Sequence, residues 1–238
     1  MKAIILAAGM GTRISKFINE RPKSMVDIGG MFLLDHTINL LKKRCITDIC
    51  VCVGYDACYI KDNLVNNDVT FVYNPFFNVT NGIASIWFAK EFIDINEDLL
   101  IMSGDLFIED DILDIALGSS FNPVLLVDST RIIEADYRFN YENNILKKHG
   151  KDLSIEETNG ENLGLAVLRG AFVEIYKQHM EEMINNQISS VWWESVLYDL
   201  IPTTNIYVED VCGKFWAEVD QYEDYRRILI HKKTYEKN

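Results

Sequence analysis

The sequence has little that would place the chain in or across a membrane. None of its apolar runs, over 238 residues, approaches the roughly 18 consecutive residues that a membrane span requires. The apolar run at the N-terminus is too short for a signal peptide and is followed by no cleavage site. We therefore expect a cytoplasmic location and no membrane partner.

The sequence also lacks a cysteine framework. Its five cysteines form no CxxC pair and are odd in number, which argues against both a disulfide scaffold and a structural zinc site. Cys50 and Cys52 alternate along a predicted strand, so both point to one face of it. We expect both to be buried in the core and not to bind a metal.

Positive charge is scarce as well. Against 36 Asp and Glu residues there are 23 Lys and Arg residues, and the formal net charge is −13. Such a chain repels nucleic acid unless it carries a concentrated basic stripe, so we expect no nucleic-acid partner. A small anionic ligand remains compatible with this charge, because a few focused cations and a bound metal can reverse the local sign.

The first fifty residues have the pattern of a strand, a helix and a second strand. Residues 2–7 are apolar at successive positions, as in a parallel strand that is covered on both faces. Apolar residues at helical spacing follow over 32–43, and the run DICVCV at 48–53 predicts the second strand. Because a helix connects them, the two strands are expected to lie parallel.

The alternation of strands and helices continues for another fifty residues. Strands are predicted over 69–74 and 99–102, with a helix over 83–92 between them. This pattern predicts an α/β fold with a mixed, mostly parallel sheet flanked by helices, in which ligands bind at the carboxyl ends of the strands. We expect one domain over residues 1–238, because no linker or internal repeat interrupts the chain.

The second half is less regular. After a strand at 123–128, the charged passage to Lys151 predicts a small β-rich flap over the site. A turn is expected over 159–162, then a strand over 163–170. Further predicted elements are a helix whose apolar stripe belongs to the core (Phe172, Tyr176, Met180, Met183), a helix over 191–200, a strand near 206–208 and a terminal helix with Tyr222, Tyr225 and Leu229 on one side.

The loop after the first strand is the strongest candidate for phosphate binding. Gly9 and Gly11 allow positive φ and close backbone approach, and Arg13 and Lys23 supply cations nearby. The spacing fits neither of the standard phosphate loops, GxGxxG and GxxxxGK followed by Ser or Thr. An ordinary strand-to-helix turn is therefore an alternative explanation for the glycines alone.

The whole string is more specific than its glycines. KAIILAAGMGTR followed by RPKSMVDIGG resembles the opening of the nucleotidyltransferases that join NTPs to sugar 1-phosphates and small phosphorylated alcohols. The resemblance implies a Rossmann-like nucleotidyltransferase fold, and implies that Arg13 and Lys23 act on the phosphates at the reacting centre. It further implies a nucleotide-binding set that comprises Leu6, Ala7, Ala8, Gly9, Gly11, Thr12, Arg13, Lys23 and Gly54.

The same resemblance implies a catalytic Mg²⁺ held by two distant carboxylates. Asp105 follows the fourth strand in SGDLF, and Asp220 lies near the C-terminus in WAEVDQYEDY. Each has a simpler alternative, since Asp105 could belong to a turn and Asp220 could be the N-cap of the last helix. Glu218 is a candidate for supporting the two ligands.

The implied reaction needs few protein groups. An oxygen of the acceptor's phosphate or phosphonate attacks the α-phosphorus of the nucleotide, and pyrophosphate leaves. Because that oxygen is already an anion, no general base is required, and the four histidines all fall outside the motifs. The expected work of Mg²⁺, Arg13 and Lys23 is to reduce repulsion and to stabilise charge on the α-phosphate.

The stretch TNGIASIW bears on the nucleotide base. It resembles the corresponding passage of the cytidylyltransferases that act on phosphocholine, aminoethylphosphonate and related small acceptors, which implies that Asn81 and Ser85 face the nucleotide or the acceptor. By this resemblance the nucleotide is CTP. Alternatively, Asn81 only caps the following helix.

The aromatic residues bear on the acceptor. Tryptophan faces attract ammonium groups, so Trp192, Trp193 and Trp216 are candidates for binding a choline or aminoethyl head. On the predicted helix Trp192 and Trp193 point about 100° apart, so at most one of them is expected to line the site. Arg131 is a candidate for an anionic group of the acceptor, although core tryptophans and a solvated arginine are the common alternatives.

Together these features predict an Mg²⁺-dependent cytidylyltransferase that joins CMP from CTP to a small phosphorylated or phosphonate metabolite, of the phosphocholine, phosphoethanolamine or aminoethylphosphonate kind. One alternative is the same chemistry with UTP or dTTP and a sugar 1-phosphate. Another is a nucleotide-binding regulatory protein without catalysis. The presence of Lys23, Asp105 and Asp220 together counts against the last.

Overall fold

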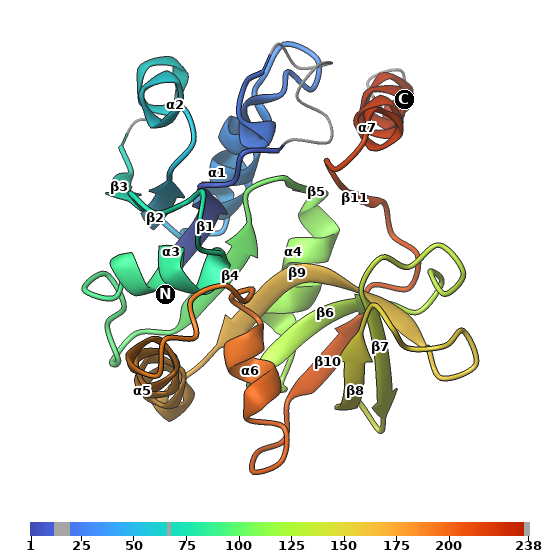
Figure 1. The fold of residues 1–238 in the computed structure, drawn as a ribbon. Coiled ribbons are helices and arrows are strands. Elements are labelled where there is room, and N and C mark those ends of the chain that lie inside the picture. The colour runs from blue at the N-terminus through green and yellow to red at the C-terminus, as the bar shows by residue number, and fades with distance from the viewer. Residues whose placement is uncertain (12–19, 66–67, 236–238) are drawn as a thin grey trace.

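The computed structural model describes residues 1–11, 20–65 and 68–235 (Figure 1). Its strands are β1 (Lys2–Ala7), β2 (Asp48–Val53), β3 (Thr70–Tyr73), β4 (Leu99–Ser103), β5 (Leu106–Ile108), β6 (Val124–Asp128), β7 (Arg138–Glu142), β8 (Ile145–Gly150), β9 (Gly160–Leu168), β10 (Tyr207–Asp210) and β11 (Trp216–Glu218). Its helices are the short 3₁₀ helix η2 (Lys23–Met25) and α1 (Leu33–Lys43), α2 (Ala57–Asn63), α3 (Gly82–Phe88), α4 (Asp110–Gly118), α5 (Ala171–Asn185), α6 (Ser195–Asp199) and α7 (Tyr222–Tyr235).

The main sheet has a parallel part and an antiparallel part. Its strand order in the described residues is β3-β2-β1-β4-β9-β6-β10-β8-β7, and the four strands β3, β2, β1 and β4 run parallel, as expected. From β9 onward most pairs are antiparallel, and β7 also pairs with β9, so the last five strands close on themselves. The prediction of a mostly parallel sheet is therefore wrong for the second half, where hairpins and returning strands replace helical crossovers.

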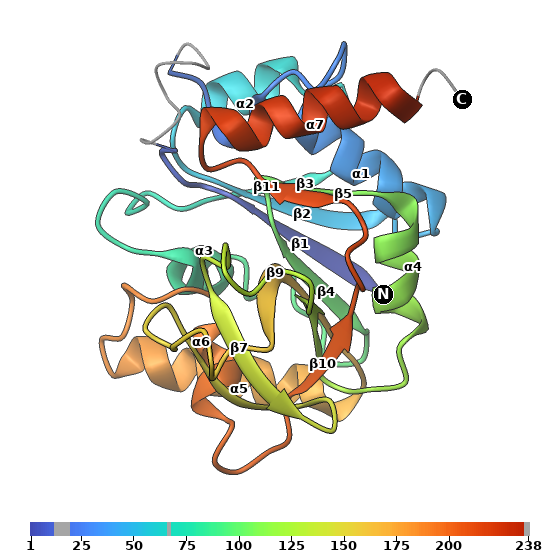
Figure 2. The same ribbon diagram turned by 90° about the vertical axis from the view of Figure 1, so that its right-hand side faces the viewer.

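Helices cover both faces of the sheet. Ile5 packs on the side of α1 and α4, whereas its neighbour Ile4 packs on the side of α3, α5 and α6. Figure 2 shows α1 on one side of the sheet and α5 with α6 on the other. Because each face is covered, strand residues of both parities are apolar, which explains the unbroken apolar runs of the sequence. Cys50 and Cys52 are both fully buried on one face, as predicted.

Two local predictions are wrong because tertiary contacts override them. Residues 191–194 are not helical, and α6 begins only at Ser195. The segment before it instead accepts hydrogen bonds from the first turn of α3, with Ile83 N donating to Val191 O at 3.3 Å. Likewise residues 160–162 belong to β9 and not to a turn. The side chain of their polar neighbour Asn159 forms hydrogen bonds with the backbone of Tyr141, so it does not close a turn.

Two predicted helices differ in detail from those observed. The helix predicted over 83–92 ends at Phe88, and turns follow it. In α7 the buried residue is Ile228, with Tyr225 partly buried, whereas Tyr222 is exposed. The stripe of Phe172, Tyr176, Met180 and Met183 on α5 is buried, as predicted. None of the helices in the described ranges is long and apolar enough to cross a membrane.

Candidate active site

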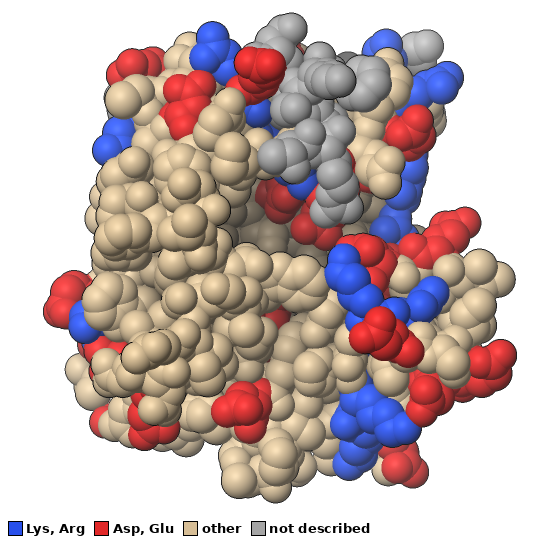
Figure 3. All heavy atoms as spheres, in the orientation of Figure 1, with Lys and Arg blue, Asp and Glu red and all other residues tan. Residues whose placement is uncertain are grey.

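A cavity of about 290 Å³ opens at the carboxyl ends of β1 and β4. One wall comes from the loop after β1 and from α3, and another from the closed part of the sheet and the segment before α6. Figure 3 looks onto this hollow, inside which acidic side chains are visible. The position is the one expected for a ligand site in an α/β sheet.

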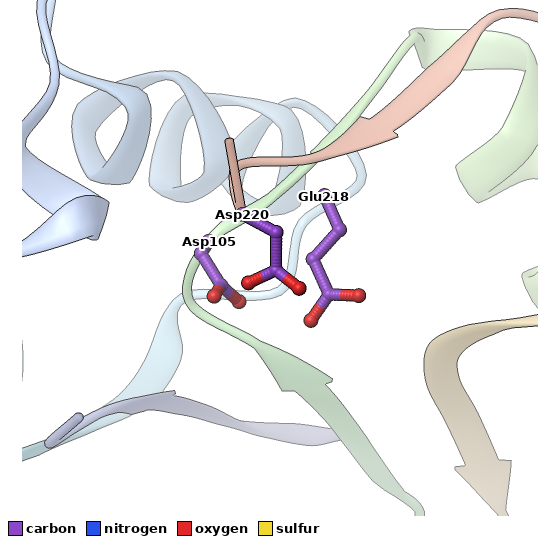
Figure 4. A group of neighbouring side chains, drawn as sticks. All are labelled: Asp105, Glu218 and Asp220. Carbon is purple, nitrogen blue, oxygen red and sulfur yellow. The ribbon is translucent and has the colours of Figure 1, made fainter. Parts of the chain in front are cut away.

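Three carboxylates converge at one end of the cavity (Figure 4). Asp105, Glu218 and Asp220 each offer an oxygen, and these oxygens lie within 4.8 Å of one another. The pairing of β5 with β11 brings them together, because Glu218 lies opposite Leu106 and Val219 N donates to Asp105 O at 2.9 Å. Residues more than a hundred positions apart in the sequence thus form one acidic group.

Lys23 lies among these carboxylates. Its Nζ donates to Asp220 Oδ1 and, at 3.3 Å, to Asp105 Oδ2. Burial by itself lowers the pKa of Lys23, but the charges of Asp105, Asp220 and Glu218 outweigh this and hold the pKa above its ordinary value. The lysine is therefore a fixed cation at the end of the cavity.

The acidic group is more negative than Lys23 can balance. Burial raises the pKa of Asp105 against the opposing charge of Lys23, and Asp220 raises it further. The pKa of Glu218 lies well above its ordinary value, through burial and then through repulsion by Asp105 and Asp220. A cluster of carboxylate oxygens with this excess of charge is the donor set that Mg²⁺ and Mn²⁺ prefer, so the residues present could hold such an ion.

The glycine loop fits around Lys23. Gly11 has a φ of +58°, and a Cβ placed there would lie 2.5 Å from Lys23 Cγ. Gly11 thus adopts the positive φ that a glycine allows, and the space without a side chain is filled by the lysine stem. Gly9 lines the cavity and does not have a positive φ.

The other predicted residues of the loop divide into two sets. Leu6 and Ala8 line the cavity together with Gly9, whereas Ala7 is buried and Gly54 lies behind the loop, against Ala8 O and Phe77. The predictions for Thr12 and Arg13 fall outside the described residues.

The N-terminus of α3 forms the next part of the wall. Asn81 and Ser85 both line the cavity, and Asn81 also caps α3, with Gly82 N donating to its Oδ1 at 2.8 Å. Asn81 therefore caps α3, which was the alternative explanation for it, and also lines the cavity. Ser85 Oγ accepts a hydrogen bond at 3.0 Å from Nδ2 of Asn74. Asn74 is buried and lines the cavity, although it was predicted from the sequence only as the end of a strand.

The tryptophans do not lie as expected. Because residues 191–194 are not helical, Trp192 and Trp193 both line the cavity, and the expectation that at most one would do so is wrong. Trp216 lines a different cavity and is 2% exposed, with its Nε1 donating to Asp128 Oδ2 at 2.9 Å. Arg131 stacks over the Trp216 ring and pairs with Glu161 at 3.3 Å. The structure therefore brings neither Trp216 nor Arg131 to the wall of the main cavity.

The flap predicted between 128 and 151 is the hairpin of β7 and β8, and it reaches the cavity. Asp136, Tyr137 and Lys151 line it from this side. Lys151 Nζ pairs with Asp136 Oδ2 at 2.7 Å and lies 5.2 Å from the centroid of the Trp192 ring. The flap thus meets the segment before α6 at the mouth of the cavity.

Glu194 is a further residue of the cavity, and no prediction from the sequence named it. It lies between Trp193 and α6, lines the cavity and is 7% exposed. Burial raises its pKa to about 7, opposed by hydrogen bonds from its own backbone N–H and from Asn162. The signal available in the sequence was an acidic residue next to two tryptophans.

Comparison with known proteins identifies the fold and the class of this site. Residues 3–120 match the family model described as the MobA-like NTP transferase domain. The chain is a nucleotidyltransferase. The family match covers the loop after β1, Lys23, α3 and Asp105, whereas Glu218 and Asp220 lie beyond it.

Relatives of this nucleotidyltransferase extend the likeness over the whole chain. It is 25% identical to the choline-phosphate cytidylyltransferase of Streptococcus pneumoniae over 96% of each chain, and 24% identical to that of Haemophilus influenzae over 96% of each. It is 30% identical to the CTP:phosphoglutamine cytidylyltransferase of Campylobacter jejuni over 55% of this chain and 53% of the relative.

Solved structures share the fold. The CTP:phosphocholine cytidylyltransferase of Streptococcus pneumoniae matches 97% of this chain and 98% of its own, with a TM-score of 0.76 and 22% identity. The inositol-1-phosphate CTP transferase of T. maritima matches 95% of this chain and 94% of its own, with a TM-score of 0.79 and 19% identity. Both likenesses support the nucleotidyltransferase fold that the opening residues implied.

Proposed function

We propose that the chain is an Mg²⁺-dependent cytidylyltransferase that joins CMP from CTP to a small phosphorylated or phosphonate metabolite. The observation that carries this proposal is the convergence of Lys23 with Asp105, Glu218 and Asp220 at one end of a cavity. A cavity that only bound a nucleotide would not need this group of charges. The choice of CTP is supported by the full-length likeness to two choline-phosphate cytidylyltransferases.

In the proposed reaction an oxygen of the acceptor's phosphate or phosphonate attacks the α-phosphorus of CTP. A bond forms between this oxygen and phosphorus while the bond from phosphorus to the bridging oxygen breaks, and pyrophosphate leaves with the electron pair. The attacking oxygen is already an anion, so no residue has to remove a proton.

The chain's own residues would position the reactants and stabilise charge. Leu6, Ala8 and Gly9 would hold the nucleotide on one wall, with Asn81 and Ser85 beside them. Lys23 would bind the α-phosphate as charge spreads over its oxygens. Asp105 and Asp220, with Glu218, would hold Mg²⁺, which when bound supplies charge neutralisation and orients the phosphates.

The first experiment measures pyrophosphate release from CTP, UTP and dTTP with Mg²⁺ over a panel of acceptors. The panel contains phosphocholine, phosphoethanolamine, 2-aminoethylphosphonate, polyol phosphates and sugar 1-phosphates. We expect release with CTP and a small phosphorylated or phosphonate acceptor. Release only with UTP or dTTP and a sugar 1-phosphate would replace the proposal, and no release with any pair would contradict it.

The second experiment tests the metal-binding residues. Asp105→Asn and Asp220→Asn should each lower kcat at least about 100-fold, because the transition state loses a ligand of its metal. Asp111→Asn is a matched control, since Asp111 is exposed on α4 and pairs with Lys214 away from the cavity. Unchanged kcat in Asp105→Asn, with thermal unfolding like that of the parent, would remove this residue from the metal site.

A further inference from the structure

Glu194 is a buried carboxylate that the transfer reaction does not use. Its side chain lines the cavity at 7% exposure, next to Gly164 of β9. A Cβ placed on Gly164 would lie 3.9 Å from Glu194 Oε1 and 3.1 Å from Ser103 Oγ. The carboxylate therefore lies beside the end of β4, near but outside the acidic group that contains Asp105.

This carboxylate has few partners of its own. Among the described residues its side chain accepts one long hydrogen bond from another residue, from Asn162 Nδ2 at 3.4 Å. A desolvated carboxylate is costly unless it is paired, and it has more acceptor capacity than one such bond fills. Glu194 thus has acceptor capacity left for a group inside the cavity.

Four of the five other carboxylates that line the cavity form ion pairs, and the fifth, Glu218, belongs to the acidic group at the proposed metal site. Asp136 pairs with Lys151, and Glu161 pairs with Arg131. Asp105 and Asp220 share Lys23. In the part of the chain that the structure describes, no Lys, Arg or His forms an ion pair with Glu194. A cationic group of a ligand is the partner that would complete it.

The aromatic rings around Glu194 indicate which kind of cation fits. The Tyr137 and Tyr198 rings stack at 5.7 Å, and His149 stacks on Tyr198 at 4.0 Å. Trp192 meets the Tyr137 ring edge to face at 5.0 Å, and Lys151 lies over the Trp192 ring. Trp192 is 38% exposed and is the open ring of this group, whereas Trp193 is 3% exposed and the Tyr137, Tyr198 and His149 rings stack on one another. A quaternary ammonium needs open aromatic faces on several sides. A primary ammonium instead needs acceptors for its N–H groups, which Glu194 provides.

We propose that Glu194 binds a primary ammonium group on the acceptor, through a charge-assisted hydrogen bond, and so selects amino-bearing acceptors over quaternary ammonium ones. This inference rests on the proposed function, because it concerns the acceptor of the same reaction. It distinguishes the chain from the choline-phosphate cytidylyltransferases that it resembles.

The first test compares acceptors and variants by the kcat/KM of pyrophosphate release from CTP. Phosphoethanolamine or 2-aminoethylphosphonate should exceed phosphocholine by about 10- to 100-fold, the range of one charge-assisted hydrogen bond. Glu194→Gln should remove most of this preference, mainly through a higher KM for the amino acceptor. Asp136→Asn is the matched control, because this carboxylate already has a cationic partner, and the ratio between acceptors should stay within about threefold.

Two outcomes of this test would overturn the inference and leave the proposed function standing. In the first, the parent protein has a kcat/KM for phosphocholine, or for an acceptor without nitrogen, at least as high as that for the amino acceptors. In the second, Glu194→Gln lowers kcat/KM equally for all acceptors, which would indicate that Glu194 has a structural role.

The second test needs no turnover. Isothermal titration calorimetry should show 2-aminoethylphosphonate binding the parent protein about tenfold or more tightly than ethylphosphonate, and the difference should vanish in Glu194→Gln. Equal affinities of the two compounds for the parent protein would refute the role of Glu194. If no NTP and acceptor pair gives pyrophosphate while this affinity difference is found, the proposed function fails and the ammonium site stands.

Discussion

Gly11 matters because of a side chain that lies next to it. The Lys23 stem fills the space in which a Cβ at Gly11 would stand, so the glycine permits the lysine to reach Asp105 and Asp220. A glycine in a phosphate loop is often explained by backbone contact with the ligand. Here the structure adds a packing reason that applies with no ligand bound.

Gly11→Ala should therefore act on catalysis more than on folding. We expect kcat of the cytidylyl transfer to fall about tenfold or more as Lys23 is displaced, and stability to fall by about 1 kcal/mol because of the positive φ. Pyrophosphate release and denaturant unfolding measure the two effects. Gly118→Ala is the control, since Gly118 has neither a positive φ nor a close neighbour. Equal activity of the two variants would contradict this role of Gly11.

Glu194 should make the stability of the protein depend on pH. Its folded pKa of about 7 lies above the ordinary 4.5, so the folded state binds more protons and stability falls as pH rises between these values. The titratable groups that face it are Asp105, Tyr137, Tyr176, Tyr198 and Glu218. The tyrosines stay neutral over this range, because burial raises the pKa of Tyr137 to about 12 and holds those of Tyr176 and Tyr198 well above their ordinary value.

Glu194→Gln should remove that dependence. Relative to the parent it should be more stable at pH 8, by at most about 3 kcal/mol, and the difference should approach zero near pH 4.5. Thermal or urea unfolding across this range measures it. Glu157→Gln is the control, because Lys148 lowers the pKa of that exposed carboxyl and no gain with pH is expected there. A constant difference between Glu194→Gln and the parent at all pH values would contradict the assignment.

At the scale of elements, the short pair of β5 and β11 assembles the acidic group. Asp105 precedes β5 and Asp220 follows β11, so the two carboxylates meet only where these strands pair. The hydrogen bond from Val219 N to Asp105 O at 2.9 Å closes the ladder at that end. A three-residue strand pair thus determines the geometry of the predicted metal site.

Val219→Pro should disrupt this geometry, because proline has no N–H for Asp105 O. We expect a loss of stability of about 3 kcal/mol and a fall in kcat of at least about 100-fold. Val219→Ala keeps the N–H and loses only buried methyl groups, so it should cost roughly 1 to 3 kcal/mol and retain most of the activity. Calorimetry and pyrophosphate release separate the two effects. A proline variant as active as the alanine variant would show that the ladder bond is dispensable.

At the scale of the whole molecule, the cavity joins two different parts of one sheet. Strands β1 and β4 of the parallel part carry one wall, and β9 with the flap of the closed part carries another. A ligand in the cavity contacts both parts and would stabilise the folded state by binding only to it.

CTP with Mg²⁺, each at about 100 times its dissociation constant, should stabilise the protein by about 2.7 kcal/mol or more. For a chain of this size the midpoint of thermal unfolding should rise by about 5 to 10 °C. Asp105→Asn should lose the part of this rise that depends on Mg²⁺. An unfolding midpoint that CTP and Mg²⁺ do not change would contradict binding in this cavity.

The sequence by itself determined the parallel half of the fold and one side of the site. Unbroken apolar runs separated by helical spacing specify covered parallel strands, because each residue of such a strand meets a packed layer. The loop string with Lys23, and the resemblance that it carries, pointed to the nucleotidyltransferase class before any contact was known. These signals are local: each depends on residues that are neighbours in the sequence, so each can be recognised without the tertiary structure.

The tertiary structure alone decided the rest. The resemblance implied that Asp105 and Asp220 share a metal, but that they meet depends on the pairing of β5 with β11, two strands that lie far apart in the sequence. That Trp192, Trp193 and Glu194 line the cavity depends on hydrogen bonds between α3 and residues 189–191, which keep this segment out of a helix. Long-range pairing and side-chain packing override local propensity at such positions, and no periodicity in the sequence records them.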